Sequence, residues 1–110
     1  MDKRTELSLL LDCYGPLLTQ KQRSMLEQHI GEDCSLGEIA EREGISRQAV
    51  RDALLRGEEQ LRSYEEKLGM LGRDMALIAA LKELAGETEQ KSVREGLLSL
   101  IERIEENDGV

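Results

Sequence analysis

The chain has 110 residues, and 23 acidic against 15 basic side chains give it a formal net charge of −8 at pH 7. An acidic balance of this size argues against a dedicated nucleic-acid binder, whose binding face is usually basic. Hydrophobic residues make up 39% of the chain, but Phe and Trp are absent, so the core must be mainly aliphatic. No apolar run approaches the roughly 20 residues that span a bilayer, and no secretory signal pattern opens the chain. We therefore expect a cytoplasmic protein.

Two helices are predicted before the central part of the chain. The first covers about residues 5–14, where four side chains fall on one helical face: Leu7, Leu10, Leu11 and Tyr14. Gly15-Pro16 ends this helix. Thr19 and Gln22 have the spacing of a capping box, which predicts the start of a second helix that runs through Ile30.

The segment Ser35 to Arg56 has the pattern of a helix-turn-helix motif, whose second helix enters a DNA major groove in many DNA-binding proteins. Ser35 and Glu38 repeat the capping-box spacing and predict the start of the first helix of the motif. Gly44 stands where that helix must end in a sharp turn, and glycine adopts a left-handed backbone at little cost. Ser46 is expected to cap the second helix.

The second helix of the motif presents the candidate binding residues. Arg47, Gln48 and Arg51 are predicted to point outward, next to Ser46. Arginine and glutamine side chains read guanine and adenine edges or bind phosphates, so contact with a DNA groove is one interpretation. The other interpretation is a solvated helix face in a fold that binds protein. The acidic balance of the chain leaves both open.

The chain downstream of the motif also looks helical. An internal glycine costs only ~1 kcal/mol, so the second helix of the motif is predicted to continue to about Leu68. Gly69 and Gly72 predict a break. Two further helices, over about residues 73–85 and 89–106, carry apolar side chains at helical spacing and are expected to pair as a hairpin.

These patterns predict two units, a helix-turn-helix domain over residues 1–68 and a C-terminal hairpin over residues 69–110. Apolar side chains at heptad-like or helical spacing further predict a symmetric homodimer. The candidate dimerisation residues are Leu54, Leu61, Leu68, Leu71, Leu97, Leu100, Ile101 and Ile104. For the seam from Leu54 to Leu71, the alternative is packing within one chain, against Leu77, Ile78 and Leu81.

No residue pattern in the chain indicates catalysis or a cofactor. Cys13, Cys34 and the single His29 lack the spacing of a metal site. We interpret the acidic pairs Glu58-Glu59 and Glu65-Glu66 as helix surface, because nothing apolar is positioned to separate their pKa values. The chain has no glycine-rich phosphate loop and no nucleophile–base set, so we expect no enzymatic activity.

Three runs of sequence carry a family resemblance: L-L-L-D-C-Y-G-P-L-L-T-Q-K-Q (Leu9 to Gln22), S-L-G-E-I-A and I-S-R-Q-A-V-R-D. They resemble the YlxM-like family of small bacterial proteins, whose members look like region four of sigma factors, and the resemblance covers about residues 6–71. It implies an all-α, dimeric protein without enzymatic activity. Together with the residue patterns above, it predicts a winged-helix-like or sigma region-four-like helical bundle, with the long helix and the C-terminal helical hairpin that the spacing of apolar residues indicates. Arg51 departs from the family pattern, in which Tyr is usual.

The resemblance also implies a role in the signal recognition particle pathway. The chain would then be a regulator or adaptor that binds a partner protein or ribonucleoprotein, such as the particle's GTPase or its RNA. That role was inferred for the family from genes that lie beside those for the GTPase and its receptor. The motif taken alone favours a second hypothesis, a sequence-specific DNA-binding transcription regulator.

Overall fold

A computed structural model of the chain describes residues 1–107. The helical elements follow in this order: α1 (Lys3–Tyr14), η1 (Gly15–Leu17), α2 (Gln20–Leu26), η2 (Glu27–Gly31), α3 (Leu36–Glu43), α4 (Arg47–Leu68), α5 (Met70–Glu87) and α6 (Lys91–Asn107). No strand occurs among the described residues, which confirms the all-α prediction and leaves the motif without a β wing. The last three residues of the predicted unit 69–110 lie outside the described part of the chain.

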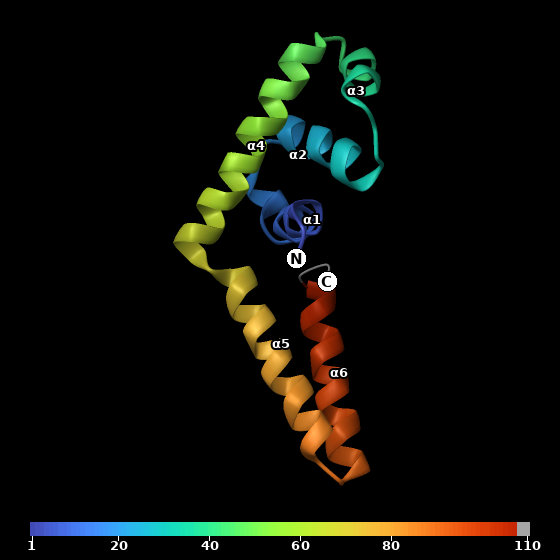
Figure 1. Ribbon diagram of the computed structural model, residues 1–110, viewed down its shortest axis with the longest axis vertical. Helices are drawn as coiled ribbons and strands as arrows, with labels where there is room; N and C mark the ends of the chain where they lie inside the picture. Colours follow the sequence, from blue (N-terminus) through green and yellow to red (C-terminus); the bar gives the residue numbers. More distant parts are fainter. Residues whose placement is uncertain (108–110) are drawn as a thin grey trace.

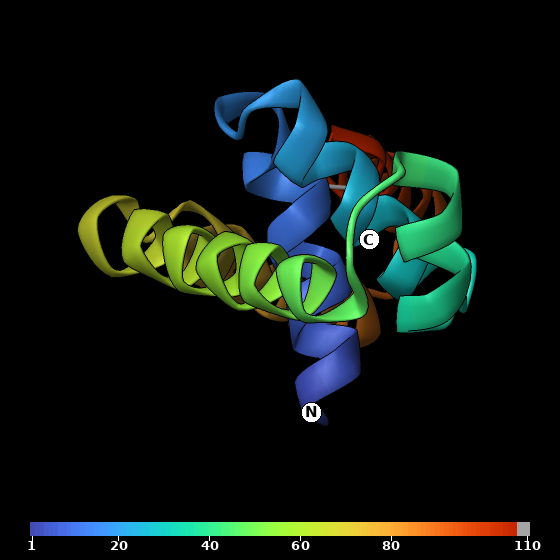
Figure 2. The same cartoon turned by 90° about the horizontal axis from the view of Figure 1, so that it is seen from above.

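Helix α4 is the long element on which the N-terminal helices pack. Figure 1 shows α1, α2 and α3 on the same side of α4, and in Figure 2 α1 crosses α4 at a steep angle. The main core lies between these helices and η2, and its buried members are Leu7, Leu10, Leu11, Tyr14, Leu18, Met25, Leu26, Ile30, Cys34, Ile39, Ala40, Val50, Leu54, Leu61 and Leu71. All four side chains predicted for the inward face of the first helix belong to this core.

Helices α2 and α4 come close together at Gly57, a buried residue in the middle of α4. A Cβ atom at this position would lie 2.7 Å from Cδ1 of Leu26, whose own side chain is only 1% exposed. The glycine weakens the helix slightly, but it leaves the space that the buried leucine fills. From the sequence alone, only the loss of helix stability at this glycine could be predicted, and not the close contact with Leu26 that it allows.

A hydrogen-bond network at the corner between α4 and α5 joins three helices. Tyr14 Oη in α1 donates to Glu65 Oε1 in α4 at 2.5 Å and accepts from the backbone N–H of Met70 at 3.0 Å. The Glu65 carboxylate also accepts from the N–H groups of Leu71 at 3.1 Å and Gly72 at 3.0 Å. A helix offers no partner within itself to its first N–H groups, and its positive dipole end attracts a carboxylate. Tyr14 and Glu65 therefore cap α5 from two other helices.

This network explains two differences from the sequence prediction. Gly69 ends α4 with a φ of 60°, as predicted, but Gly72 lies inside α5 and breaks nothing. Helix α5 begins at Met70 instead of near residue 73, because its first turn is capped. The interpretation of Glu65 as helix surface is wrong, since its carboxylate is part of a half-buried network.

The hairpin of α5 and α6 has a second, much smaller core. Ile78, Leu81 and Ile101 are buried in it, and the half-buried Leu97 and Ile104 pack against them. The hairpin extends away from the N-terminal helices (Figure 1), which gives the molecule extents of 58 × 26 × 22 Å.

The two helices of the hairpin are also joined where the chain turns between them. Arg94 of α6 donates to the carbonyl oxygens of Ala85 at 3.2 Å and Thr88 at 2.6 Å. These bonds supply partners at the C-terminal end of α5, which extends past its predicted last residue to Glu87.

The contact at Gly57 predicts the effect of adding one methyl group. We expect Gly57→Ala to lower the free energy of unfolding by about 1–3 kcal/mol, because overpacking against Leu26 outweighs the gain in helix propensity. Urea unfolding followed by circular dichroism measures this change. Gly86→Ala is the matched control, since a Cβ there meets no atom within 4 Å. Equal stabilities for the two variants would contradict the prediction.

The corner network predicts a large difference between two neighbouring glutamates. Glu65→Ala leaves two N–H groups of α5 and the Tyr14 hydroxyl without their partner, so the free energy of unfolding should fall by about 1–3 kcal/mol. Glu66→Ala removes an exposed carboxylate and should change it by no more than ~0.5 kcal/mol. The same urea measurement separates the two variants. A smaller loss for Glu65→Ala than for Glu66→Ala would rule out the capping role.

Burial, together with the hydrogen bond to the Glu65 carboxylate, raises the pKa of Tyr14 from 10.0 to about 12. The folded state therefore favours the protonated phenol, and this contribution to stability is present below pH 10 and lost as the pH rises toward 12. Tyr14→Phe removes the ionisation. We expect the stability difference between the wild type and this variant to shrink over that pH range in urea unfolding experiments, and a constant difference would contradict the assignment.

Candidate functional site

The helix-turn-helix motif is held together by local caps. Ser35 Oγ accepts from the N–H of Glu38 at 3.1 Å, and Glu38 Oε1 accepts from the N–H of Ser35 at 3.2 Å. The backbone N–H of Ser35, and after it the Ser35 side chain, stabilise the Glu38 carboxylate and so lower the pKa of Glu38. Gly44 takes a φ of 68° at the turn, and Ser46 Oγ accepts from the N–H of Ala49 at 3.0 Å. Both caps and the glycine turn agree with the sequence prediction.

Two of the predicted binding residues are exposed but engaged with their neighbours. The guanidinium of Arg47 lies over α3, so that a Cβ on Gly37 would be 3.1 Å from Arg47 Nη2. Gln48 Nε2 donates to Asp52 Oδ1 at 3.0 Å, one turn along α4. Ser46 is used as the cap of the helix. Reading a base would therefore require Arg47 and Gln48 to leave these positions.

Arg51 lies on the same exposed side of α4, next to a hollow. A cavity of about 200 Å³ is lined by His29, Leu36, Arg51, Leu54 and Leu55. His29 is half-buried, and its Nδ1 lies 3.1 Å from the carbonyl oxygen of Cys34. Arg51 thus sits at the boundary between the charged end of α4 and an apolar surface.

Several cations near the motif have no acidic partner among the described residues. Among residues 1–107, four basic side chains at the start of α2 and in the first half of α4 are exposed and make no ion pair within 4.0 Å: Lys21, Arg47, Arg51 and Arg56. The acidic residue closest in sequence to this group on α4 is Asp52, which accepts from Gln48. This part of an acidic protein can therefore bind an anionic group.

Sequence reasoning missed a groove between α2 and α4 next to the motif. The groove has a volume of about 310 Å³ and is lined by Thr19, Lys21, Gln22, Met25, Ile45, Ala49, Ala53 and Arg56. Its lining combines apolar side chains with a cation from each helix, Lys21 and Arg56. No local sequence pattern predicts this groove, because it forms only when two segments that are distant in sequence pack together. Lys21 and Arg56 therefore join the candidate binding residues.

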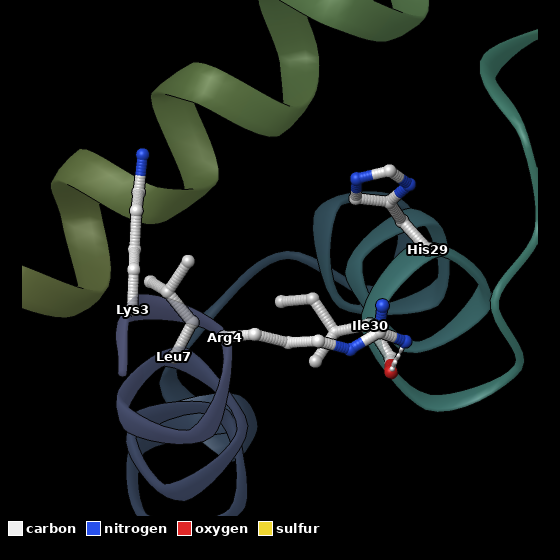
Figure 3. A pocket seen from close by; sticks show the side chains of 5 residues that line it. All are labelled: Lys3, Arg4, Leu7, His29 and Ile30. Carbon is white, nitrogen blue, oxygen red and sulfur yellow. Dashed lines mark hydrogen bonds between the residues drawn. The ribbon is translucent and has the colours of Figure 1, made fainter. Parts of the chain in front are cut away.

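A hollow between α1 and η2 is less suited to a ligand. Figure 3 shows its five lining side chains, which enclose about 260 Å³: Lys3, Arg4, Leu7, His29 and Ile30. Arg4 Nη2 donates to the carbonyl oxygen of Ile30 at 3.0 Å and also pairs with Asp33, while Lys3 Nζ lies 3.8 Å from Glu58 Oε2. Its cations are thus already used to join helices.

The predicted dimerisation residues fall into three groups. Leu54, Leu61 and Leu71 are buried in the main core, and Ile101 is buried in the hairpin core. Leu97 and Ile104 are half-buried, whereas Leu68 and Leu100 are exposed. The heptad-like spacing in α4 thus serves packing against α1 and α2 within one chain. Its partners there are not Leu77, Ile78 and Leu81, which lie in the hairpin.

Two further observations concern the part of the chain that the structure describes. Within residues 1–107, no cluster of three or more His, Cys, Asp or Glu side chains is arranged to hold a metal ion. None of the helices in that range is long and apolar enough to cross a membrane.

Known proteins share this sequence along almost its full length. The model of a family described as "Putative helix-turn-helix protein, YlxM / p13 like" matches residues 1–104. UPF0122 proteins of Bacillus cereus (strain Q1), Bacillus anthracis (strain A0248) and Bacillus thuringiensis subsp. konkukian (strain 97-27) are each 44% identical to this chain over 111 residues. Each comparison covers 98% of this chain and 99% of the relative. The chain therefore belongs to the UPF0122 family of YlxM/p13-like helix-turn-helix proteins.

Proposed function

We propose that this helix-turn-helix protein is a regulator in the signal recognition particle pathway and acts by binding a partner protein or ribonucleoprotein. The particle's GTPase and its RNA are the candidate partners. The observation that carries the binding role is the exposed start of α4, where Arg47 and Arg51 have no ion pair among the described residues. The proposal includes a cytoplasmic location and a homodimer, and it includes no enzymatic activity or cofactor.

The charge of the chain favours a protein surface over naked nucleic acid as the partner, so of the two candidate components it favours the GTPase over the RNA alone. A net charge of −8 repels a polyanion at distances where individual contacts do not yet act. The side chains that would read bases are also engaged, Arg47 over Gly37 and Gln48 with Asp52. A protein or folded ribonucleoprotein can instead contact the unpaired cations and the apolar groove beside them, which includes Ala49 and Ala53.

A sequence-specific DNA-binding regulator is the second candidate. The exposed Arg51 favours it, because this side chain lies on the recognition helix without an acidic partner within 4.0 Å among residues 1–107. Loss of one bidentate base contact would cost about 1–3 kcal/mol and relax specificity at a single position. With few cations available, the binding constant would depend only weakly on salt. Each phosphate contact adds about 0.9 to the slope of the logarithm of the binding constant against the logarithm of the salt concentration.

Binding to purified components separates the two candidates. We expect the wild-type protein to bind the GTPase of the signal recognition particle, alone or with its RNA, in a fluorescence anisotropy titration. Arg47→Ala and Arg51→Ala should weaken that binding about tenfold or more, because arginines at the centre of an interface contribute strongly. Lys82→Ala is the control, since it removes the same charge from an exposed position on α5.

A gel shift with genomic DNA fragments at physiological salt completes this test. Weak binding without sequence preference agrees with the proposal. A nanomolar complex with a particular DNA sequence, combined with no binding to either particle component, would overturn it in favour of the DNA-binding regulator.

A further inference from the structure

We infer that a second copy of this chain packs on one face of the hairpin, formed by five exposed apolar side chains: Met70, Leu77, Leu84, Val93 and Leu100. We call this surface the hairpin face. The inference deepens the homodimer of the proposed function by naming the surface that forms it. It does not depend on which partner the helix-turn-helix motif binds.

The side chains of the hairpin face are unusually exposed for their type. They are between 37% and 51% exposed in the single chain, although they are among its large apolar residues. On α5 they recur every seven residues, at Met70, Leu77 and Leu84, and on α6 Val93 and Leu100 have the same spacing. A repeat of seven keeps side chains along one stripe of a helix, as in helices that pack against a partner.

The two stripes lie on the same side of the hairpin. Leu77 directly precedes the buried Ile78 in α5, and Leu100 directly precedes the buried Ile101 in α6. One residue turns a helix by about 100°, so each stripe is displaced by the same angle and in the same sense from the side that faces the other helix. Because α5 and α6 run in opposite directions (Figure 1), equal displacements place both stripes on one face.

The surface area of the chain is larger than a monomer of its size exposes. Its accessible surface is 7248 Å², whereas a compact monomer of this mass exposes about 6100 Å². The excess of about 1100 Å² reflects the elongated shape and is larger than the ~800 Å² that each partner buries in a standard protein interface, so the hairpin offers enough surface for one. The radius of gyration is 17.5 Å, whereas a compact chain of this length has about 13 Å. The protruding hairpin causes this difference as well.

A second hairpin is the occupant that these features fit. Two helices enclose only a small core, here Ile78, Leu81 and Ile101, and two such hairpins packed face to face form a four-helix bundle. A face that packs on its own copy must be self-complementary, and an apolar stripe meets this condition because it needs no oppositely charged surface. Ala80 and Gly96 border the stripes and allow another helix to come close.

The other exposed leucines do not form a comparable stripe: Leu17, Leu55 and Leu68 are exposed on η1 and α4, outside the hairpin. Leu54, Leu61 and Leu71 are buried in the main core of one chain. Leu98 is 50% exposed, but around the axis of α6 it lies about 60° from Ile101, on the side away from Leu100. This leucine therefore serves as an internal control, because it is as exposed as the members of the hairpin face and lies outside it.

Sedimentation velocity on matched glutamate variants tests the inference. We expect the wild type to sediment at micromolar concentration with twice the 12.4 kDa mass of one chain. Leu77→Glu and Leu100→Glu each place a charge in the interface and should raise the dimer dissociation constant about 100-fold or more. Leu98→Glu should leave it unchanged, and circular dichroism establishes that each variant keeps its helix content.

A second measurement uses only the wild-type protein, which is diluted until the dimer dissociates, so it does not depend on whether a variant folds. Leucine methyl NMR signals of Leu77, Leu84 and Leu100 should shift as the dimer dissociates, whereas that of Leu98 should not. A monomeric wild type, or a dimer that Leu98→Glu dissociates and Leu77→Glu does not, overturns the inference. A monomer that still binds the particle's GTPase would overturn only the dimer and leave the binding role of the motif standing.

Discussion

The hydrogen bonds of Tyr14 and Glu65 are the interaction on which the arrangement of the molecule depends. They join α1 to α4 and supply partners to the first three N–H groups of α5. Within residues 1–107 they are the side-chain hydrogen bonds that hold the start of α5 to the main core, in addition to the apolar burial of Leu71. The direction in which the hairpin leaves the N-terminal helices is thus set by two side chains from two different helices.

The sequence predicts the parts of the fold that local interactions decide. The capping boxes at Thr19 and Ser35 and the left-handed turn at Gly44 lie within a few residues of their partners, and all three are found as predicted. The sequence does not reveal the role of Glu65, because its partner Tyr14 lies 51 residues away. The leucine spacing in α4 was ambiguous for the same reason, since heptad spacing describes a stripe and says nothing about which chain covers it.

The candidate site was predictable in its place and not in its details. The exposed positions of Arg47, Gln48 and Arg51 follow from helical periodicity once the caps are known. The placement of Arg47 over Gly37 depends on how α3 and α4 cross, and the groove that holds Lys21 and Arg56 depends on how α2 and α4 cross. Crossing angles come from the packing of whole helices, so a pattern of residue types does not contain them.

The order of the corner residues along the chain has a consequence for how the protein folds during synthesis. Tyr14 and Glu65 both precede α5, so a chain that emerges from its N-terminus has both capping groups before the first turn of α5 follows. Nucleation is the unfavourable step of helix formation, and here a preassembled acceptor set lowers its cost. We therefore expect the N-terminal helices to form before α5 during synthesis, and the hairpin to be the last part of the fold to be completed.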